Sequence, residues 1–150
     1  MTGVGGRVHA TSVALRRGRN WRAALLRGPS GAGKSDLALR LIEAGWRLVA
    51  DDQTELVRQG RRVMASAPPR IAGLIEARGL GIVELARDQL VRRAPVLLLV
   101  DLTHPERIER LPESASETVL GIKLPVVSLA PFEASTPAKL RLALMQIANA

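Results

Sequence analysis

One stretch of the chain has the residue types and the spacing needed to hold a row of phosphate groups. It consists of Gly28, Pro29, Ser30, Gly31, Ala32, Gly33, Lys34 and Ser35. The pattern is G-x-x-x-x-G-K-[ST], in which glycines let the backbone curl so that successive N–H groups point at phosphate oxygens. We expect Lys34 to reach between the β- and γ-phosphates and the Ser35 hydroxyl to bind Mg²⁺. The predicted ligand is a nucleoside triphosphate.

This loop occurs in kinases, ATPases and GTPases, so it does not by itself select a reaction. The motif requires a strand before the loop and a helix after it, and the sequence has an apolar segment before residues 28–35 and an amphipathic helical pattern after them. The chain has no N-K-x-D pattern of the kind that selects guanine. The predicted cofactors are therefore ATP and Mg²⁺.

Two places offer carboxylates that would assist the loop from the end of a neighbouring strand. Asp51 and Asp52 follow the apolar run 48–50, and Asp101 follows the apolar run 96–100. Adjacent residues of an extended chain point to opposite faces, so one aspartate of the pair can face the phosphates while the other does a separate task. That division suits a base and a metal-linked acid. The alternatives are a solvated turn for the pair and a turn cap for Asp101.

Glu76 and Arg78 flank an alanine just before two glycines. A strand would bring both side chains to one face, as a metal ligand and a cation for the transferred phosphate. The alternative is a surface ion pair before a flexible loop. His9 has no local partner in its own segment, V-H-A-T, and a lone histidine of this kind is ordinarily structural.

Alternating strand and helix patterns must position these residues. The predicted strands are 8–15, 23–26, 47–50, 55–57, 63–65, 96–100 and 126–129, and the predicted helices are 34–44 and 136–147. The run 96–100 is apolar on both faces, as a strand buried between two layers must be. The alternation indicates an α/β protein.

Length and composition limit the class of protein. The 150 residues, 47% of them hydrophobic, predict one domain over 1–150 with its own core. The absence of cysteine, of a signal-peptide core and of an apolar run long enough to cross a bilayer favours the cytoplasm and no membrane partner.

The net charge of +8 resides in residues 1–70, which indicates an anionic partner there. The alternative is an arginine-rich solubilising surface. With no Tyr, one Phe and two Trp, the chain lacks platforms on which single-stranded nucleic acid could stack, so no nucleic-acid partner is expected.

Four segments together resemble the catalytic domain of HPr kinase/phosphorylase. They are V-H-A-T at 8–11, G-P-S-G-A-G-K-S at 28–35, L-V-A-D-D at 48–52 and G-L-I-E-A-R-G-L-G-I at 73–82. Their order and spacing match as well, and the D-D pair and the I-E-x-R-G-L-G segment are far more particular than the loop. The resemblance implies a P-loop kinase-like fold of the PEP carboxykinase-like variant, with a central mixed sheet flanked by helices.

The resemblance also implies an activity, which is transfer of the γ-phosphate of ATP, with Mg²⁺, to a serine of an HPr-like phosphocarrier protein of a phosphotransferase system. By the same matching the catalytic residues are His9, Lys34, Asp52 and Arg110, and the Mg²⁺ ligands are Ser35 and Glu76. Asp52 would accept the proton of the substrate serine, and His9 would lie near it.

Departures from the family pattern mark where the resemblance ends. Typical members carry an extra N-terminal domain, so this chain resembles a short form with the catalytic domain only. The family is often hexameric, which implies a homo-oligomer, and its bifunctional members also remove phosphate by phosphorolysis. Residues 129–135, L-A-P-F-E-A-S, replace a P-x-R-P-G-R-N-like loop tied to phosphorolysis and subunit contacts, so neither property follows from the residues here.

Two other functions remain open on the sequence. The first is an ATP-binding sensor or switch that signals through a partner without phosphorylating it. The second is a small-molecule kinase, although such enzymes usually cover their substrate with a mobile lid, and the sequence shows no long insertion that would supply one.

Overall fold

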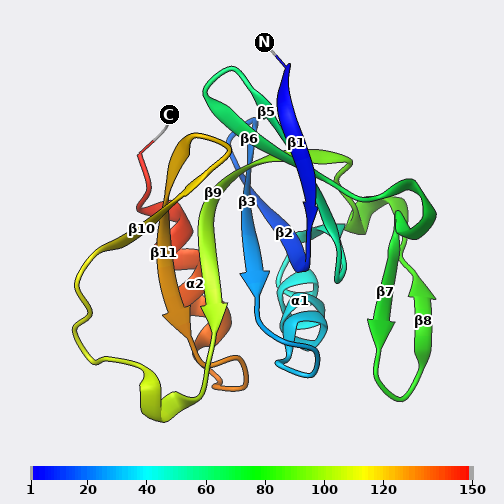
Figure 1. The fold of residues 1–150 in the computed structure, drawn as a ribbon. Helices are drawn as coiled ribbons and strands as arrows, with labels where there is room; N and C mark the ends of the chain where they lie inside the picture. Colours follow the sequence, from blue (N-terminus) through cyan, green and yellow to red (C-terminus); the bar gives the residue numbers. More distant parts are fainter. Residues whose placement is uncertain (1, 149–150) are drawn as a thin grey trace.

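The computed structural model describes residues 2–148, in which one curved mixed sheet packs against two α-helices (Figure 1). The main sheet contains β1 (Thr2–Val8), β2 (Ala10–Arg17), β3 (Asn20–Arg27), β4 (Arg47–Ala50), β5 (Thr54–Gln59), β6 (Arg62–Ser66), β9 (Arg93–Leu102), β10 (Ala115–Val119) and β11 (Ile122–Leu129). A separate hairpin contains β7 (Leu74–Ala77) and β8 (Gly81–Glu84), and the helices are α1 (Lys34–Glu43) and α2 (Thr136–Met145). The predicted α/β class with a central mixed sheet is confirmed.

Strand β9 is the centre of the sheet, as its apolar sequence predicted. Its first residues pair antiparallel with β6, and its later residues pair in parallel with β3 on one side and β11 on the other. Leu98, Leu99 and Val100 are at most 1% exposed, because both faces of the strand are covered. The strand is longer than predicted and includes Pro95, which lies where β9 passes from β6 to β3.

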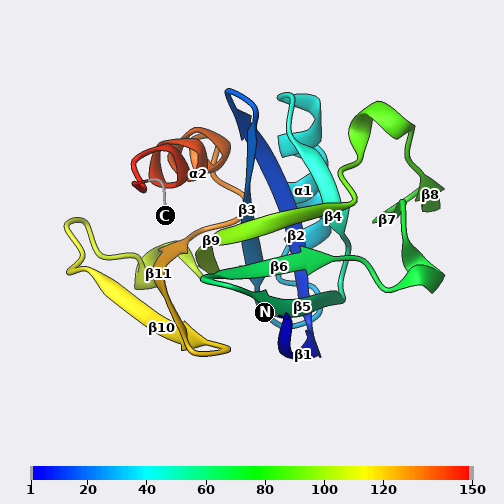
Figure 2. The same cartoon turned by 90° about the horizontal axis from the view of Figure 1, so that it is seen from above.

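The two faces of the sheet bury two separate apolar clusters. Ala24 and Leu26 of β3 share one cluster with side chains of α1 and α2. Ala23 and Leu25, which alternate with them, share the other cluster with side chains of β5 and β6. Figure 2 shows both helices on one side of the strands, with β5 and β6 on the other. The helices therefore flank one face, while the curled sheet covers its own second face.

The strands that carry the predicted site have their relevant ends at the same end of the sheet, which is where the parallel strands terminate. Strands β3, β9 and β11 run in parallel and end there (Figure 1). Strand β2 pairs antiparallel with both β3 and β4, so β4 also terminates at this end of the sheet and β2 begins there. Segments after β3 and β4 and before β2 are thus brought together, although they are far apart in the sequence.

The buried side chain of Arg22 ties strand β3 to the end of helix α2. Arg22 is 1% exposed, and its Nη1 donates hydrogen bonds to the carbonyl oxygens of Leu144, at 2.9 Å, and Ile147, at 2.6 Å. A cation at this position compensates the unpaired carbonyl groups and the negative dipole end of the helix.

None of the helices described between residues 2 and 148 is long and apolar enough to cross a membrane.

Replacing Arg22 with Met is expected to lower the free energy of unfolding by about 2–4 kcal/mol, since buried carbonyl groups lose charged donors. Thermal and urea unfolding followed by circular dichroism measure the change. The control is Arg19→Met, in the exposed turn between β2 and β3. Equal stability of the two variants would contradict the role given to Arg22.

Candidate active site

The loop 28–35 joins the end of β3 to the start of α1, as predicted. Gly31 and Gly33 adopt φ angles of 84° and 100°, a region that favours glycine because it has no Cβ. Gly33 is the N-cap of α1, and no side chain among residues 2–148 caps the N-terminus of this helix. The first-turn N–H groups of α1 therefore have no side-chain cap, which is the arrangement that binds an anion.

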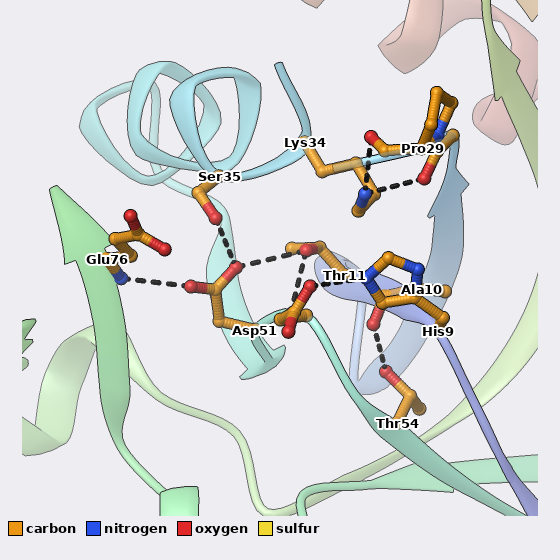
Figure 3. Close-up of polar contacts among 11 residues, drawn as sticks. His9, Ala10, Thr11, Pro29, Lys34, Ser35, Asp51, Thr54 and Glu76 are labelled. Atoms are coloured by element: carbon orange, nitrogen blue, oxygen red, sulfur yellow. Dashed lines mark hydrogen bonds and ion pairs between the residues drawn. The ribbon is translucent and has the colours of Figure 1, made fainter. Parts of the chain in front are cut away.

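Lys34 lies over the loop that carries it. Its Nζ donates hydrogen bonds to the carbonyl oxygens of Gly28, at 2.6 Å, and Pro29, at 3.0 Å, and the residue is 5% exposed (Figure 3). An ammonium group has three donors, so these two bonds leave one for another acceptor. The ammonium group is thus held beside the N-terminus of α1. The positive charge and the positive end of the helix dipole both favour binding of an anion there.

Asp51 is the acid that faces the loop. Its Oδ1 accepts hydrogen bonds from the hydroxyl groups of Ser35, at 2.6 Å, and Thr11, at 3.0 Å (Figure 3). Its Oδ2 accepts a hydrogen bond from the backbone N–H of Glu76, at 2.9 Å. The residue is 6% exposed. One carboxylate therefore ties together the loop, β2 and β7.

Asp52 points elsewhere, as the alternation of side chains predicted. Its Oδ1 lies 2.7 Å from Nε2 of His9, and its side chain is 58% exposed. Its backbone N–H donates to Thr11 Oγ1 at 3.0 Å, and its φ of 66° is a left-handed conformation that aspartate adopts more readily than most residues. His9 is thereby brought against Asp52, as the resemblance implied.

Thr11 is the site residue that the sequence reasoning did not assign. It is fully buried, and its hydroxyl donates to Asp51 and accepts from the backbone of Asp52. It therefore sets the positions of both aspartates. The available signal was a pair of adjacent hydroxyl residues, Thr11 and Ser12, in a strand whose other buried residues are apolar.

The oxygen atoms at this end of the sheet suit Mg²⁺. Figure 3 shows the Glu76 carboxylate directed from β7 towards Ser35, next to Asp51. Mg²⁺ in phosphate sites is bound by one or two carboxylates together with phosphate oxygens and water. In residues 2–148 no group of three or more His, Asp or Glu side chains is placed to hold a metal. Ser35 and Glu76 thus fit an ion shared with phosphate, with Asp51 orienting the Ser35 hydroxyl.

Asp101 does not take part in this cluster, and both sequence interpretations of it are wrong. It accepts two hydrogen bonds from Arg27, at 2.8 and 3.2 Å, because the two residues are neighbours in the register of β3 and β9. Arg27 also donates to Glu117 of β10 at 2.8 Å, which holds the pKa of Glu117 below its usual value. Asp101 therefore belongs to a structural ion-pair group.

Two other arginines fall outside the cluster. Strand β7 ends at Ala77, so Arg78 lies in the turn to β8, and the prediction that it would share a strand face with Glu76 is wrong. The turn begins there because Gly79 and Gly81 adopt positive φ angles. Arg110 is exposed in the loop after the 3₁₀ turn Pro105–Arg107, and its catalytic role stays a prediction.

The chain is similar to known proteins of one family. The profile of the HPr Serine kinase C-terminal domain matches residues 22–140. The HPr kinase/phosphorylases of Burkholderia cenocepacia and Paraburkholderia phymatum are each 42% identical to the chain over 113 residues, which cover 70% of this chain and 35% of theirs. The solved structure of the Hpr(Ser) kinase/phosphatase from Coxiella burnetii is similar with a TM-score of 0.78 and 26% identity, over 94% of this chain and 88% of that one. The chain spans about a third of the length of the curated relatives it matches, and it belongs to the HPr Serine kinase C-terminal domain family.

Proposed function

We propose that residues 1–150 form a single P-loop catalytic domain that transfers the γ-phosphate of ATP to a serine of an HPr-like phosphocarrier protein of a phosphotransferase system. The observation that supports this most is one hydrogen-bonded path across the site. It runs from Ser35 through Asp51 and Thr11 to Asp52 and His9. The path joins a phosphate-binding loop to an open carboxylate, which are the two parts that phosphoryl transfer needs.

The loop binds and orients the triphosphate in this proposal. Its backbone N–H groups, the N-terminus of α1 and the ammonium group of Lys34 stabilise negative charge on the phosphoryl oxygens. Mg²⁺, held by Ser35 and Glu76, would neutralise charge that develops between the β- and γ-phosphates. Asp51 holds the Ser35 hydroxyl in position, because that hydroxyl donates a hydrogen bond to the Asp51 carboxylate.

Asp52 orients the attacking serine and receives its proton. As the serine oxygen bonds to the γ-phosphorus, the bond to the leaving ADP breaks and the serine proton passes to the Asp52 carboxylate. One Asp52 oxygen lies against His9, which steadies the carboxylate while the other oxygen is open to a substrate. His9 therefore acts here as a positioning residue for the base.

The surroundings of Asp52 favour a protein acceptor over a small molecule. Asp52 and Glu76 line a cavity of about 580 Å³ next to the β7–β8 hairpin. Ile82 of β8 also lines this cavity and is 65% exposed, and Leu80 at the hairpin turn is 82% exposed. Figure 1 shows this hairpin standing away from the main sheet. Exposed apolar side chains beside an open base suit contact with the surface of another protein.

Incubation with γ-labelled ATP, Mg²⁺ and a purified HPr-like phosphocarrier tests the proposal. We expect label on the carrier and none on a carrier whose acceptor serine is replaced by alanine. ATP binding without label on the carrier would instead support the sensor or switch. ATP is a cytoplasmic cosubstrate, so the proposed location is the cytoplasm. The homo-oligomer stays a prediction.

A further inference from the structure

The single phenylalanine of the chain is exposed beside the phosphate-binding loop. Phe132 is 67% exposed, although large apolar side chains are normally covered. A Cβ built on Gly33 would lie only 2.7 Å from Cζ of Phe132, so the ring rests directly against the loop. The contact with the loop covers only part of the ring, so packing within the protein does not explain why an aromatic residue stands here.

Phe132 lines a cavity of about 450 Å³ that opens next to the loop. The cavity is formed by residues 29–32 of the loop, by 102–105 and Arg107 at and beyond the end of β9, and by 130–132 after β11. Its volume lies within the usual range for small-molecule sites. We call this cavity the β11-side pocket.

The backbone that carries Phe132 is firmly held. The hydroxyl of Thr136 donates a hydrogen bond to the carbonyl oxygen of Ala130, and the guanidinium of Arg40 donates one to the carbonyl oxygen of Pro131. Arg40 belongs to α1 and Thr136 begins α2, so both helices fix this short segment. The ring is therefore presented from a rigid support, as a preorganised binding surface requires.

The order of the strands determines which part of a nucleotide would reach this pocket. The order across this part of the sheet is β11-β9-β3-β2-β4, and the loop follows β3. Asp51 and Asp52, at the end of β4, lie on one side of the loop, whereas the β11-side pocket lies on the other. A triphosphate with its last phosphate near the aspartates extends its nucleoside towards β9 and β11.

We propose that the β11-side pocket binds the nucleoside half of ATP, with the base stacked on Phe132. Stacking on an aromatic ring accepts any base, because every base has a π-face. Arg107 also lines the pocket and is exposed, and its side chain forms no hydrogen bond or ion pair among residues 2–148, so its guanidinium can contact the bound nucleotide. This inference rests on the proposed function, since it names the subsite that holds the remainder of the same cosubstrate.

Isothermal titration calorimetry with ATP and with inorganic tripolyphosphate, each with Mg²⁺, tests the inference. Phe132→Ala is expected to weaken ATP binding roughly tenfold, the usual order of effect when a stacking partner of a base is removed. Binding of tripolyphosphate should stay unchanged, because this ligand has no base. Phe132→Trp should restore ATP binding. Leu142→Ala, a matched control at a 61% exposed position of α2, should change neither affinity.

Three outcomes would overturn the inference, and they separate it from the proposed function. If Phe132→Ala leaves the ATP affinity unchanged, the pocket does not hold the nucleoside, while ATP binding itself stands. If Phe132→Ala weakens ATP and tripolyphosphate equally, the ring supports the loop and does not contact a base. If the unmodified protein binds neither ligand, the proposed function fails and the inference fails with it.

Discussion

Asp52→Asn is expected to lower the rate of serine phosphorylation by about 10²- to 10⁴-fold, the usual contribution of a general base. The variant should keep its affinity for ATP, because Asp52 lies on the side of the path away from the loop, beside His9. Asparagine has the shape of aspartate but cannot accept the serine proton. It also tolerates the left-handed φ of 66°, so the backbone should not change.

Transfer from γ-labelled ATP to the carrier measures the loss, and calorimetry measures ATP affinity on the same preparation. Asp88→Asn is the matched control, since Asp88 is exposed in the 3₁₀ turn Arg87–Gln89. Full transfer by Asp52→Asn would show that another group accepts the proton. In that case the exposed carboxylate would be only an acceptor of the His9 hydrogen bond.

Lys34→Ala is expected to remove transfer and also to weaken ATP binding by roughly 10- to 100-fold, the range for a lost hydrogen bond to a charged group. The ammonium group lies over the loop, so its loss removes positive charge where the phosphates bind. The same substitution deletes the hydrogen bonds to the carbonyl oxygens of Gly28 and Pro29. Unfolding curves are therefore needed to show that the variant is folded.

The matched control for this change is Lys139→Ala, because Lys139 is exposed on α2 and pairs only with Glu133 among the described residues. Unchanged ATP affinity in a folded Lys34→Ala protein would rule out the binding role of this lysine. Asp52→Asn and Lys34→Ala together separate the chemical step from ATP binding. Asp52→Asn should lower only the rate of transfer, whereas Lys34→Ala should lower both the rate of transfer and the ATP affinity.

The local elements around the loop were predictable because their signals lie within short stretches of sequence. The helix 34–44 was predicted from its amphipathic pattern, and α1 begins at Lys34 and ends at Glu43, with Gly45 at a φ of 99° just beyond it. Strands were likewise predicted at 8–15 and 23–26, and β2 and β3 overlap these ranges and pair antiparallel over their whole length. Spacing and periodicity alone describe such elements.

Strands without such signals were missed. Strand β1 is rich in glycine, and the three central residues of β10 are polar, so neither resembles a strand in isolation. Each forms by pairing with one neighbour, β1 with β5 and β10 with β11. Strand β1 therefore depends on a partner that is distant in the sequence, and β10 depends on the strand that follows it after a turn.

The amino-acid sequence by itself determined that the chain carries a phosphate-binding loop between a strand and a helix, and that two adjacent aspartates would face different ways. It did not determine which acid serves the loop. Asp101 resembled a candidate until the register of β3 and β9 paired it with Arg27, and the buried hydroxyl of Thr11 directs Asp51 towards Ser35. The physical reason is that glycine spacing and side-chain alternation act over a few residues, whereas strand register joins residues from distant parts of the chain.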